Sequence, residues 1–325
     1  MRAIIPVAGI GSRLKPHTYT IPKVLLNVGG KPILAHILDK LISEDISKAT
    51  FVIGHLGDQI KKYVKKEYPQ IKSEFVIQKE LGGLGHAIYT AIPTFDDKDI
   101  FIILGDTIFD VDLKKVFNNN SSMIGVKEVA DPSRFGVAIV KNGKVEKLVE
   151  KPKDKISNLA IVGLYYISNA KVLADCLKEM VKNDVRTNGE LQLTDALQMM
   201  LEKNERISTF SVEGWYDCGK QETLLETNRI LLDNKSTNKK FSNVVINNPV
   251  FIAEDADIKN SVIGPYATIS KGCKIFDSII KDSIIGEKSE IITSLLNESI
   301  IGNNTIIKGS YKKLNTGDST EIEIH

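Results

Sequence analysis

The sequence predicts an α/β protein in which a doubly wound, mostly parallel sheet is followed by a small parallel β-helix. Three observations support this prediction. Strand and helix patterns alternate over the first two thirds of the chain, a polar segment then interrupts them, and a six-residue apolar period follows. We place a first domain at 1–234, a linker at 235–244 and the β-helix with its tail at 245–325. A chain of 325 residues is long enough for two such domains.

Short apolar runs that end in glycine or polar residues predict the strands of the first domain. The clearest runs lie at 2–8, 48–55, 73–78 and 99–106. Segments with a helical period separate them or follow them, at 32–44, 56–68, 83–95, 170–182 and 193–203. This alternation predicts a Rossmann-like sheet, whose ligands bind beyond the carboxyl ends of the strands.

Residues 136–152 follow a different pattern. Their apolar residues alternate on both sides of Asn142-Gly143, which predicts a two-residue hairpin turn. The second arm of this hairpin carries Glu150 and Lys151. We therefore expect a β-hairpin insertion that brings these two side chains over the ligand crevice.

Beyond the polar segment 231–243, isoleucines recur at a step of six residues, interrupted by steps of four. The residues in step are Ile263, Ile269 and Ile275, then Ile279, Ile285 and Ile291, then Leu295, Ile301 and Ile307. Small residues follow several of them by four positions, namely Ala267, Cys273, Ser289 and Thr305. We expect each apolar residue to point into the narrow core of a β-helix and each small residue to occupy a corner. The alternative is a set of ordinary β-sandwich strands.

The overall charge gives no reason to expect a polyanionic partner. Lysine and arginine number 43 against 41 aspartates and glutamates, a net charge of +2. This balance argues against nucleic acid and against an acidic membrane surface as partners. The three cysteines are far apart and form no metal-binding pair, which favours a reducing compartment, and we expect a cytoplasmic protein.

A glycine-containing turn directly after the first strand predicts a phosphate site. Gly9 and Gly11 leave backbone N–H groups accessible to anionic oxygens, and Arg13 and Lys23 add positive charge. A dinucleotide fingerprint would need a third glycine where Leu14 stands. Two cations so close to the turn favour a triphosphate or a pyrophosphate over a nicotinamide cofactor. A short GxG motif alone can also be no more than a tight turn.

Two aspartates follow strand patterns and are candidates for a metal site. Asp106 lies just past the apolar run 100–104, and Asp217 follows another strand pattern. Carboxylates facing a phosphate loop suit Mg²⁺, which prefers oxygen ligands. The alternative for each aspartate taken singly is a turn or helix cap.

Taken in order, these segments resemble the sugar-1-phosphate nucleotidylyltransferases. The resemblance is to the branch with glucose-1-phosphate thymidylyltransferase and UTP–glucose-1-phosphate uridylyltransferase, and it extends from Ala3 to about Asn228. The tail resembles the hexapeptide left-handed β-helix that closes the longer members. The segments that carry the resemblance are AGIGSRLKPHT, PKVLLNVGGKP, GGLGHAI, LGDTIF, RFGVAIV, VEKP, IVGLYYI, NGELQLTDAL and GWYDCG.

The resemblance implies a role for particular residues of this chain. Residues with nucleotide-binding roles are Ala8, Gly9, Gly11, Gln78 and Gly83, of which Gln78 and Gly83 read the edge of a pyrimidine. Residues with sugar-phosphate roles are Gly136, Glu150, Lys151, Ile161 and Tyr165. Arg13, Lys23 and Lys151 neutralise phosphate charge, and Asp106 and Asp217 share Mg²⁺. The implied reaction joins an NTP and a sugar 1-phosphate, with release of pyrophosphate.

Several alternatives stay open. Ala8-Gly9 is closer to the uridylyltransferase form, and Lys220 replaces a threonine common in the family, so the base (UTP or dTTP) and the sugar are undecided. Related bifunctional enzymes also acetylate an amino sugar with a histidine in the β-helix. The histidines here are His17, His36, His55, His86 and His325, none within the repeat. A non-catalytic sugar-nucleotide sensor and a purine-specific transferase are further alternatives. The β-helix predicts a homo-oligomer, a trimer in preference to a dimer or tetramer.

Overall fold

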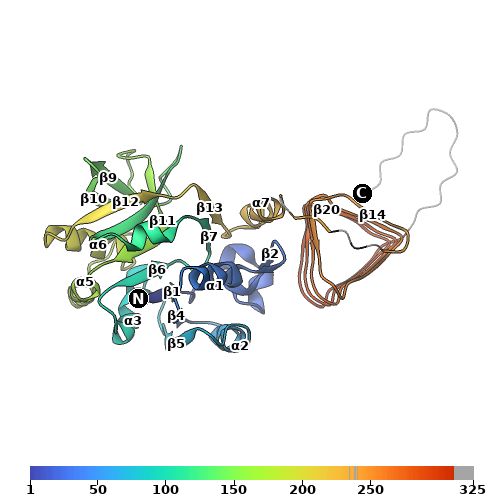
Figure 1. Cartoon of the computed structure of the whole chain (residues 1–325), viewed down its shortest axis with the longest axis horizontal. Helices are drawn as coiled ribbons and strands as arrows, with labels where there is room; N and C mark the ends of the chain where they lie inside the picture. Colours follow the sequence, from blue (N-terminus) through green and yellow to red (C-terminus); the bar gives the residue numbers. More distant parts are fainter. Residues whose placement is uncertain (234, 238, 240, 311–325) are drawn as a thin grey trace. The chain divides into compact units, whose positions relative to one another are not determined.

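The structure, a computed structural model, describes residues 1–310 except 234, 238 and 240. It divides into two compact units, which are drawn in Figure 1. The first unit consists of Met1–Leu26 and Lys31–Thr227, and the second of Asn27–Gly30 and the chain from Asn228 onward. The division falls within helix α7, Gln221–Leu232, and not after residue 234. Two residues of the proposed linker, and the tail 311–325 with His325, lie outside the described residues.

A nine-stranded sheet forms the centre of the first unit. Its first half is parallel, in the order β5 (Lys72–Ile77), β4 (Lys48–Ile53), β1 (Arg2–Pro6) and β6 (Ile100–Ile103). Its second half continues with β11 (Leu159–Ile167), β8 (Ser122–Glu128), β12 (Ile207–Ser211), β10 (Lys144–Glu150) and β9 (Gly136–Lys141). In that half only β8 and β12 run parallel to each other, because β11, β10 and β9 are antiparallel to their neighbours.

Helices cover both faces of this sheet, which confirms the doubly wound α/β fold. Successive residues of β1 point to opposite sides, so that Ile5 joins one core and Ile4 the other. Helices α1 (Ile33–Ser43) and α2 (Gly57–Glu67) pack into the Ile5 core. Helices α3 (Leu84–Ala91), α5 (Ala170–Lys182) and α6 (Leu193–Glu202) pack into the Ile4 core.

The predicted hairpin is confirmed. β9 and β10 pair antiparallel, and Asn142 and Gly143 both have positive φ, as a tight hairpin turn of this kind requires. The hairpin belongs to the edge of the main sheet. The unit also contains β3 (Lys31–Pro32), α4 (Leu113–Phe117) and a two-stranded sheet of β7 (Thr107–Asp110) and β13 (Gly214–Asp217). Short 3-10 helices lie at Ser12–Leu14, His17–Tyr19, Lys23–Leu25 and Ile92–Thr94.

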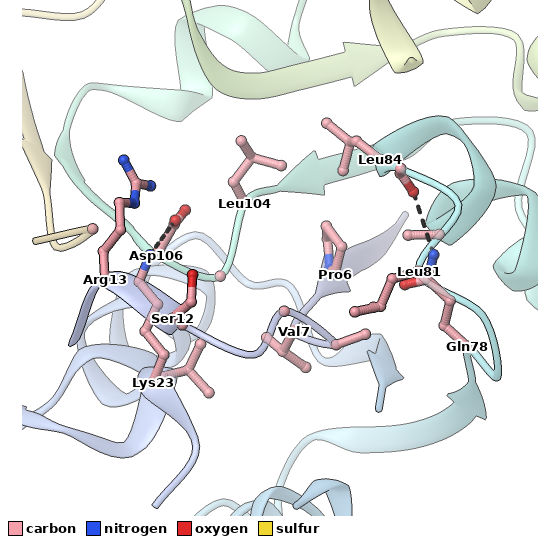
Figure 2. A pocket seen from close by; sticks show the side chains of 18 of the residues that line it. Pro6, Val7, Ser12, Arg13, Lys23, Gln78, Leu81, Leu84, Leu104 and Asp106 are labelled. Carbon is pink, nitrogen blue, oxygen red and sulfur yellow. Dashed lines mark hydrogen bonds and ion pairs between the residues drawn. The ribbon is translucent and has the colours of Figure 1, made fainter. Parts of the chain in front are cut away.

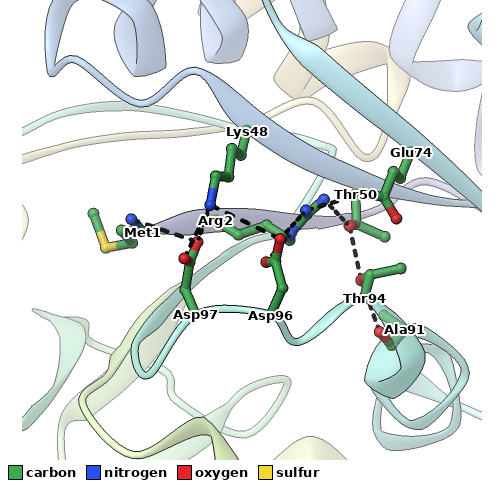
Figure 3. Close-up of polar contacts among 9 residues, drawn as sticks. All are labelled: Met1, Arg2, Lys48, Thr50, Glu74, Ala91, Thr94, Asp96 and Asp97. Carbon is green, nitrogen blue, oxygen red and sulfur yellow. Dashed lines mark hydrogen bonds and ion pairs between the residues drawn. The ribbon is translucent and has the colours of Figure 1, made fainter.

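A buried arginine closes the amino-terminal edge of the parallel strands (Figure 3). The Arg2 side chain is 1% exposed and donates to both carboxylate oxygens of Asp96, at 2.8 and 2.7 Å. It also lies 3.0 Å from a Glu74 oxygen and donates to the Thr50 hydroxyl at 3.2 Å. These partners satisfy a charge that would otherwise be costly to bury.

The second unit is a parallel β-helix, as predicted. Each of three sheets stacks one strand from each of four successive coils. The first sheet consists of β14 (Val244–Ile246), β17 (Ser261–Ile263), β20 (Ile279–Lys281) and β23 (Leu295–Asn297). The second consists of β15 (Val250–Ile252), β18 (Ala267–Ile269), β21 (Ile284–Ile285) and β24 (Ile300–Ile301). The third consists of β16 (Asp257–Lys259), β19 (Lys274–Phe276), β22 (Glu290–Ile292) and β25 (Ile306–Lys308).

Most residues predicted to line the β-helix core do so, but two do not. Ile263, Ile269 and Ile275 are fully buried, whereas Ile279 is 45% and Leu295 73% exposed. The residues that point inward in those strands are the next ones, Ile280 and Leu296. The error arose because the coil advances by five residues from Ile275 to Ile280, a step that the six-residue period does not anticipate.

Cys273 and Ser289 lie at buried corners, as predicted, whereas the prediction is wrong for Ala267, which is a buried residue of strand β18. The Cys273 thiol donates to the Gly286 carbonyl, and the Ser289 hydroxyl donates to the Gly302 carbonyl. A short segment near the amino terminus, which includes β2 (Asn27–Val28), completes this unit. In neither unit do the described residues include a helix with the length and apolar character needed to cross a membrane.

Candidate active site

A cavity of about 430 Å³ opens at the carboxyl ends of the parallel strands in the first unit (Figure 2). The loops after β1, β5 and β6 form its walls. Among the predicted site residues, eight line it: Ala8, Gly9, Gly11, Arg13, Lys23, Gln78, Gly83 and Asp106. The structure therefore brings together residues that lie up to about 100 positions apart, as expected for ligand binding at this edge of a doubly wound sheet.

The glycine loop has the backbone shape that its sequence indicates. Gly11 has φ 68°, and a Cβ there would lie 3.0 Å from Lys23 Cβ and 3.0 Å from Thr18 Cγ2. The Thr18 hydroxyl donates to the Gly11 carbonyl at 2.9 Å. A Cβ on Gly9 would meet nothing within 4 Å, so that backbone is open to the cavity. A bare turn with nearby cations suits an anionic ligand.

The two aspartates proposed for a metal lie close together. β7 and β13 pair antiparallel with Thr107 opposite Asp217, and the Cys218 N–H donates to the Asp106 carbonyl at 3.2 Å. Asp106 also accepts from Lys23 Nζ at 2.5 Å. Figure 2 shows this pair next to Arg13, which extends along the same end of the cavity.

Burial and the charge of Asp106 together raise the pKa of Asp217, while Lys23 and Arg13 oppose the rise. Two neighbouring carboxylates are costly unless a positive charge lies between or beside them. Their oxygen donors fit a hard divalent cation, for which phosphate oxygens and water complete the coordination. Among the described residues no group of three or more His, Cys, Asp or Glu side chains could hold a metal without such help.

The opposite end of the cavity carries Gln78 together with Leu81 and Leu84 (Figure 2), and Gly83 also lines the cavity. Gln78 follows β5, and its Nε2 donates to the Gly83 carbonyl at 3.3 Å. The flanking leucines give this end an apolar wall. The cavity therefore has a cationic end and an end where an amide lies among apolar side chains.

A second group of predicted residues lies around Glu150. Gly136 is opposite Glu150 in the β9–β10 pairing, and a Cβ on Gly136 would lie 2.9 Å from Glu150 Oε2 and 3.2 Å from Ile161 Cδ1. The negative charge of Glu150 adds to burial in raising the pKa of the Tyr165 hydroxyl. Lys151 Nζ lies 3.5 Å from Glu150 Oε1.

Lys151 has an unusual backbone conformation, with φ 43°. A residue with a Cβ occupies this left-handed region at a cost of about 1–3 kcal/mol, and such strain is concentrated at functional sites. The Lys151 N–H donates to the Phe135 carbonyl at 3.0 Å, which holds the strained residue in place.

Strand β11 connects the Glu150 group to the cavity. Ile161 and Tyr165 both lie on β11, and Gly163 between them accepts from the Leu104 N–H at 3.0 Å. Leu104 lines the cavity two positions before Asp106. The second group is therefore adjacent in the sheet to the strand that delivers Asp106.

Several site residues were missed by the sequence analysis. The Thr194 hydroxyl donates to Glu150 Oε2 at 2.7 Å, and Glu190 and Leu104 line the cavity. His86 contacts Gln78 Nε2 through its Nδ1 at 3.1 Å. Thr194, Glu190 and His86 lie in the segments NGELQLTDAL and GGLGHAI, which carried the resemblance, but no residue type or spacing assigned them a role.

Comparison with known proteins identifies the family of the chain. The family described as "Nucleotidyl transferase" matches residues 2–234. The chain belongs to the nucleotidyl transferase family. The prediction made from the sequence motifs is thereby confirmed, and the β-helix lies beyond the part that defines the family.

Three known proteins illustrate what this nucleotidyl transferase is similar to. It is 31% identical to the low-salt glycan biosynthesis nucleotidyltransferase Agl11 of Haloferax volcanii, with 100% of both chains covered. It is 34% identical to the bifunctional protein GlmU of Methanocaldococcus jannaschii, covering 94% of this chain and 78% of that protein. A solved UDP-glucose pyrophosphorylase in complex with UDP-glucose has a TM-score of 0.60 and 28% identity, covering 72% of this chain and 99% of that one.

Proposed function

We propose that this nucleotidyl transferase condenses UTP or dTTP with a sugar 1-phosphate, in the first instance glucose 1-phosphate, to give the nucleotide sugar and pyrophosphate. The observation that carries the proposal is the cavity with Gln78 at one end and Arg13, Lys23 and Asp106 at the other. This arrangement fits a base at the first end and phosphates at the second. The UDP-glucose pyrophosphorylase of similar fold supports the choice of sugar.

In the proposed reaction an oxygen of the sugar phosphate attacks the α-phosphorus of the nucleotide. The bond from that phosphorus to the bridging oxygen of the β-phosphate breaks, and pyrophosphate leaves with the electron pair. The attacking oxygen is already anionic, so no side chain has to remove a proton. The protein contributes orientation and positive charge.

Each cationic side chain then has a separate role. Arg13 and the bare loop at Ala8, Gly9 and Gly11 hold the nucleotide phosphates, and Lys23 neutralises the departing pyrophosphate. Lys23 is 11% exposed and paired to Asp106, so it is held at the cavity before a ligand enters. We assign Lys151 to the sugar phosphate.

We propose that Asp106 and Asp217 hold Mg²⁺, which supplies charge neutralisation at the α-phosphate when it is bound. The chemistry of the two carboxylates fits this ion, and burial, together with the charge of Asp106, raises the pKa of Asp217. Arg13 and Lys23 contribute to the same balance, because both lower the pKa of Asp217.

The residues around Glu150 provide the proposed sugar pocket. The Glu150 carboxylate can accept from sugar hydroxyls through the oxygen that Thr194 does not use. Gly136 leaves space beside that carboxylate, and Ile161 and Tyr165 supply an apolar wall. We therefore expect the sugar ring between β9, β10 and β11.

The test is a matrix of nucleoside triphosphates against sugar 1-phosphates with Mg²⁺, scored by pyrophosphate release. Asp106→Asn and Lys23→Ala should each lower kcat/KM by about 100-fold or more, the magnitude typical of lost electrostatic stabilisation. Asp110→Asn on the same strand as Thr107, and Lys62→Ala on α2, are exposed controls that should retain activity. Full activity in both site variants would refute the proposed site.

We propose nucleotidyl transfer without acetyl transfer. The named bifunctional relative is longer, since this chain covers 78% of it. None of the histidines in the sequence lies between residues 87 and 324. Incubation with acetyl-CoA and an amino-sugar phosphate should therefore release no free CoA thiol.

We further propose a cytoplasmic homo-oligomer that associates through the β-helix. Its first sheet carries an outward row of apolar side chains, one from each coil: Val245, Val262, Ile279 and Leu295. Three of the four are at least 45% exposed. The third sheet presents charged residues such as Lys259 and Lys274 instead. An exposed apolar row of this kind favours association with a second copy. The wide separation of the three cysteines in the sequence supports a reducing compartment.

A further inference from the structure

We propose that His86 fixes the orientation of the Gln78 amide, so that the cavity presents an acceptor oxygen to the base and selects nucleotides with a ring N–H. This inference rests on the proposed function in one respect, namely that the cavity holds the base of a nucleotide. It goes further because it explains which bases fit and assigns a positioning role to a residue that does not line the cavity.

The backbone position and the burial of Gln78 restrict its side chain. Its backbone N–H donates to the Ile53 carbonyl at 2.9 Å, which anchors it at the carboxyl end of β5. The residue lines the cavity but is only 6% exposed. The side chain therefore has little freedom, and whichever amide atom faces the cavity determines what a ligand meets.

The amide nitrogen of Gln78 has two neighbours within hydrogen-bond distance. Gln78 Nε2 lies 3.3 Å from the Gly83 carbonyl oxygen, which can only accept a hydrogen bond. It also lies 3.1 Å from His86 Nδ1. A primary amide nitrogen has two hydrogens, so these two partners use both of them when Nδ1 is the unprotonated ring nitrogen. The His86 proton is then on Nε2.

Within the described residues no donor is hydrogen-bonded to the amide oxygen, Gln78 Oε1, and Gln78 lines the cavity. We therefore assign Oε1 to the ligand. If the amide were rotated by 180°, Oε1 would face the Gly83 carbonyl and the His86 lone pair, and three acceptors would repel one another.

The His86 ring is itself held in place. It stacks on Tyr89 with 6.3 Å between the ring centroids. A Cβ on Gly82 would lie 2.9 Å from His86 Cγ and 3.1 Å from Nδ1, so only glycine lets the loop pass this close. The Gly82 carbonyl accepts from the Leu191 N–H at 2.9 Å, and Gly85 N–H donates to the Leu191 carbonyl at 2.8 Å. The loop and ring thus form one rigid support.

The chemistry of the bases follows from a fixed acceptor. Uracil and thymine carry an N–H at ring position 3, which can donate to Oε1. Cytosine has an unprotonated nitrogen there, which would repel it. A polar group placed for one hydrogen-bonding pattern discriminates strongly against a ligand that leaves it unpaired. The methyl group that separates thymine from uracil does not touch this contact.

Binding of UTP, dTTP and CTP to the full chain with Mg²⁺, measured by isothermal titration calorimetry, tests the inference without any need for turnover. The wild type should bind UTP and dTTP on the order of 10- to 100-fold more tightly than CTP. His86→Leu, which lacks the acceptor, should reduce this ratio about tenfold or more. His86→Asn, whose side-chain oxygen can take the place of Nδ1, should restore most of it.

Two comparisons distinguish positioning from a structural role. Gln78→Ala should also lose the discrimination, and the double variant Gln78→Ala with His86→Leu should lose no more than Gln78→Ala alone. Thermal unfolding of each variant shows whether it is folded. Equal weakening of UTP and CTP binding in His86→Leu, or a wild type that does not prefer UTP to CTP, would overturn the inference. Pyrophosphate release by the same wild-type sample is scored separately, so that failure of the reaction and failure of base selection are distinct results.

Discussion

Gly83 is the residue whose backbone is most constrained at the base end of the cavity. It has φ 100°, and a Cβ there would lie 2.7 Å from the Leu191 carbonyl oxygen and 2.8 Å from Glu190 Cβ. The adjoining residue begins α3, and the Gly83 carbonyl holds Gln78. Glycine is needed here both for its conformation and for the close approach of the 190–191 segment.

We expect Gly83→Ala to lower the free energy of unfolding by about 2–4 kcal/mol, because backbone strain and a steric clash add together. Nucleotide affinity should fall with it. Urea unfolding measures the first effect and calorimetry the second. Gly143→Ala is the matched control, since Gly143 also has positive φ (75°) but a Cβ there meets nothing within 4 Å. It should cost only about 1–2 kcal/mol. Equal losses in the two variants would contradict the clash.

Asp96 makes stability depend on pH. Hydrogen bonds from Arg2 lower the pKa of Asp96 to about 2. An aspartate in the unfolded chain has a pKa of about 3.9. As the pH falls, Asp96 is therefore protonated at a higher pH in the unfolded chain than in the folded chain. The Asp96 contribution is fully present above about pH 5 and is lost progressively as the pH falls toward 2.

We expect the difference in free energy of unfolding between wild type and Asp96→Asn to be constant from pH 7 to about pH 5 and to shrink toward pH 2. Denaturant titrations across this range measure it. Asp96 is 44% exposed, so solvent screening keeps the effect modest. A difference that stayed constant down to pH 2 would show that the ion pair does not depend on the Asp96 charge.

At the scale of residues, the charged side chains of the site were easier to predict from the sequence than the residues that hydrogen-bond to other site residues. Asp106, Lys23 and Arg13 follow strand ends or glycine turns, which are local signals. Thr194 and His86 act through hydrogen bonds to Glu150 and Gln78, residues 44 and 8 positions away. No local pattern encodes such partnerships, because they exist only after the sheet has assembled.

At the scale of elements, the β-helix shows how a short step in a repeat reverses which residue is buried. Ile279 and Ile280 are neighbours on β20, yet Ile280 is fully buried and Ile279 is 45% exposed. Successive side chains of a strand point to opposite faces of the sheet. A shift of one position in the repeat therefore exchanges the residue in the core with the residue on the surface. A step of five residues between successive sheets therefore changes which of the stacked residues in the first sheet are predicted to be buried.

We expect Ile280→Ala to lower the free energy of unfolding by about 2–4 kcal/mol at any protein concentration, because it leaves a cavity in the core. Ile279→Ala should cost less than about 1 kcal/mol in dilute solution, because its side chain already contacts water. Chemical unfolding at two protein concentrations measures both. A larger loss for Ile279→Ala than for Ile280→Ala would contradict this assignment and support burial of Ile279, as the six-residue period predicts.

Elements with local signals were predicted well. Asn142-Gly143 indicated the hairpin, and the apolar runs indicated β1, β4, β5 and β6. The position of β11 between β6 and β8 was not predictable, since it pairs antiparallel with strands that precede it by more than 30 residues. Strand order and direction depend on non-local packing, which the alternation of strand and helix patterns does not encode. The sheet is therefore less uniformly parallel than that alternation predicts.

At the scale of the whole molecule, the proposed association predicts a concentration-dependent stability. Replacing Ile279 and Leu295 with lysine places two charges in the exposed apolar row and should yield monomers. Light scattering coupled to size-exclusion chromatography gives the mass, and the wild-type Tm should rise with protein concentration. Ile306→Lys is the control, because Ile306 is 65% exposed but belongs to the third sheet. A monomeric wild type would exclude the proposal.

The sequence predicted two domains, but it could not predict that the second includes residues near the amino terminus. Gly29 N–H donates to Asn228 Oδ1 at 2.9 Å, and Asn27 Nδ2 donates to Ser270 Oγ at 3.0 Å. A Cβ on Gly30 would lie 2.5 Å from the Phe251 ring. These partners are about 200 or more positions away, beyond the reach of any composition change or repeat.

The tetrapeptide 27–30 has a consequence for building chimeras. The polypeptide passes between the units three times, after Leu26, after Gly30 and after Thr227. A recombinant exchange of tails made only at residue 228 would leave Gly29 facing a foreign surface without its Asn228 acceptor. Such a graft must include residues 27–30 from the same protein as the new tail. Because residue 27 is only four positions after Lys23, the choice of tail also constrains the sequence next to the proposed phosphate-binding residues.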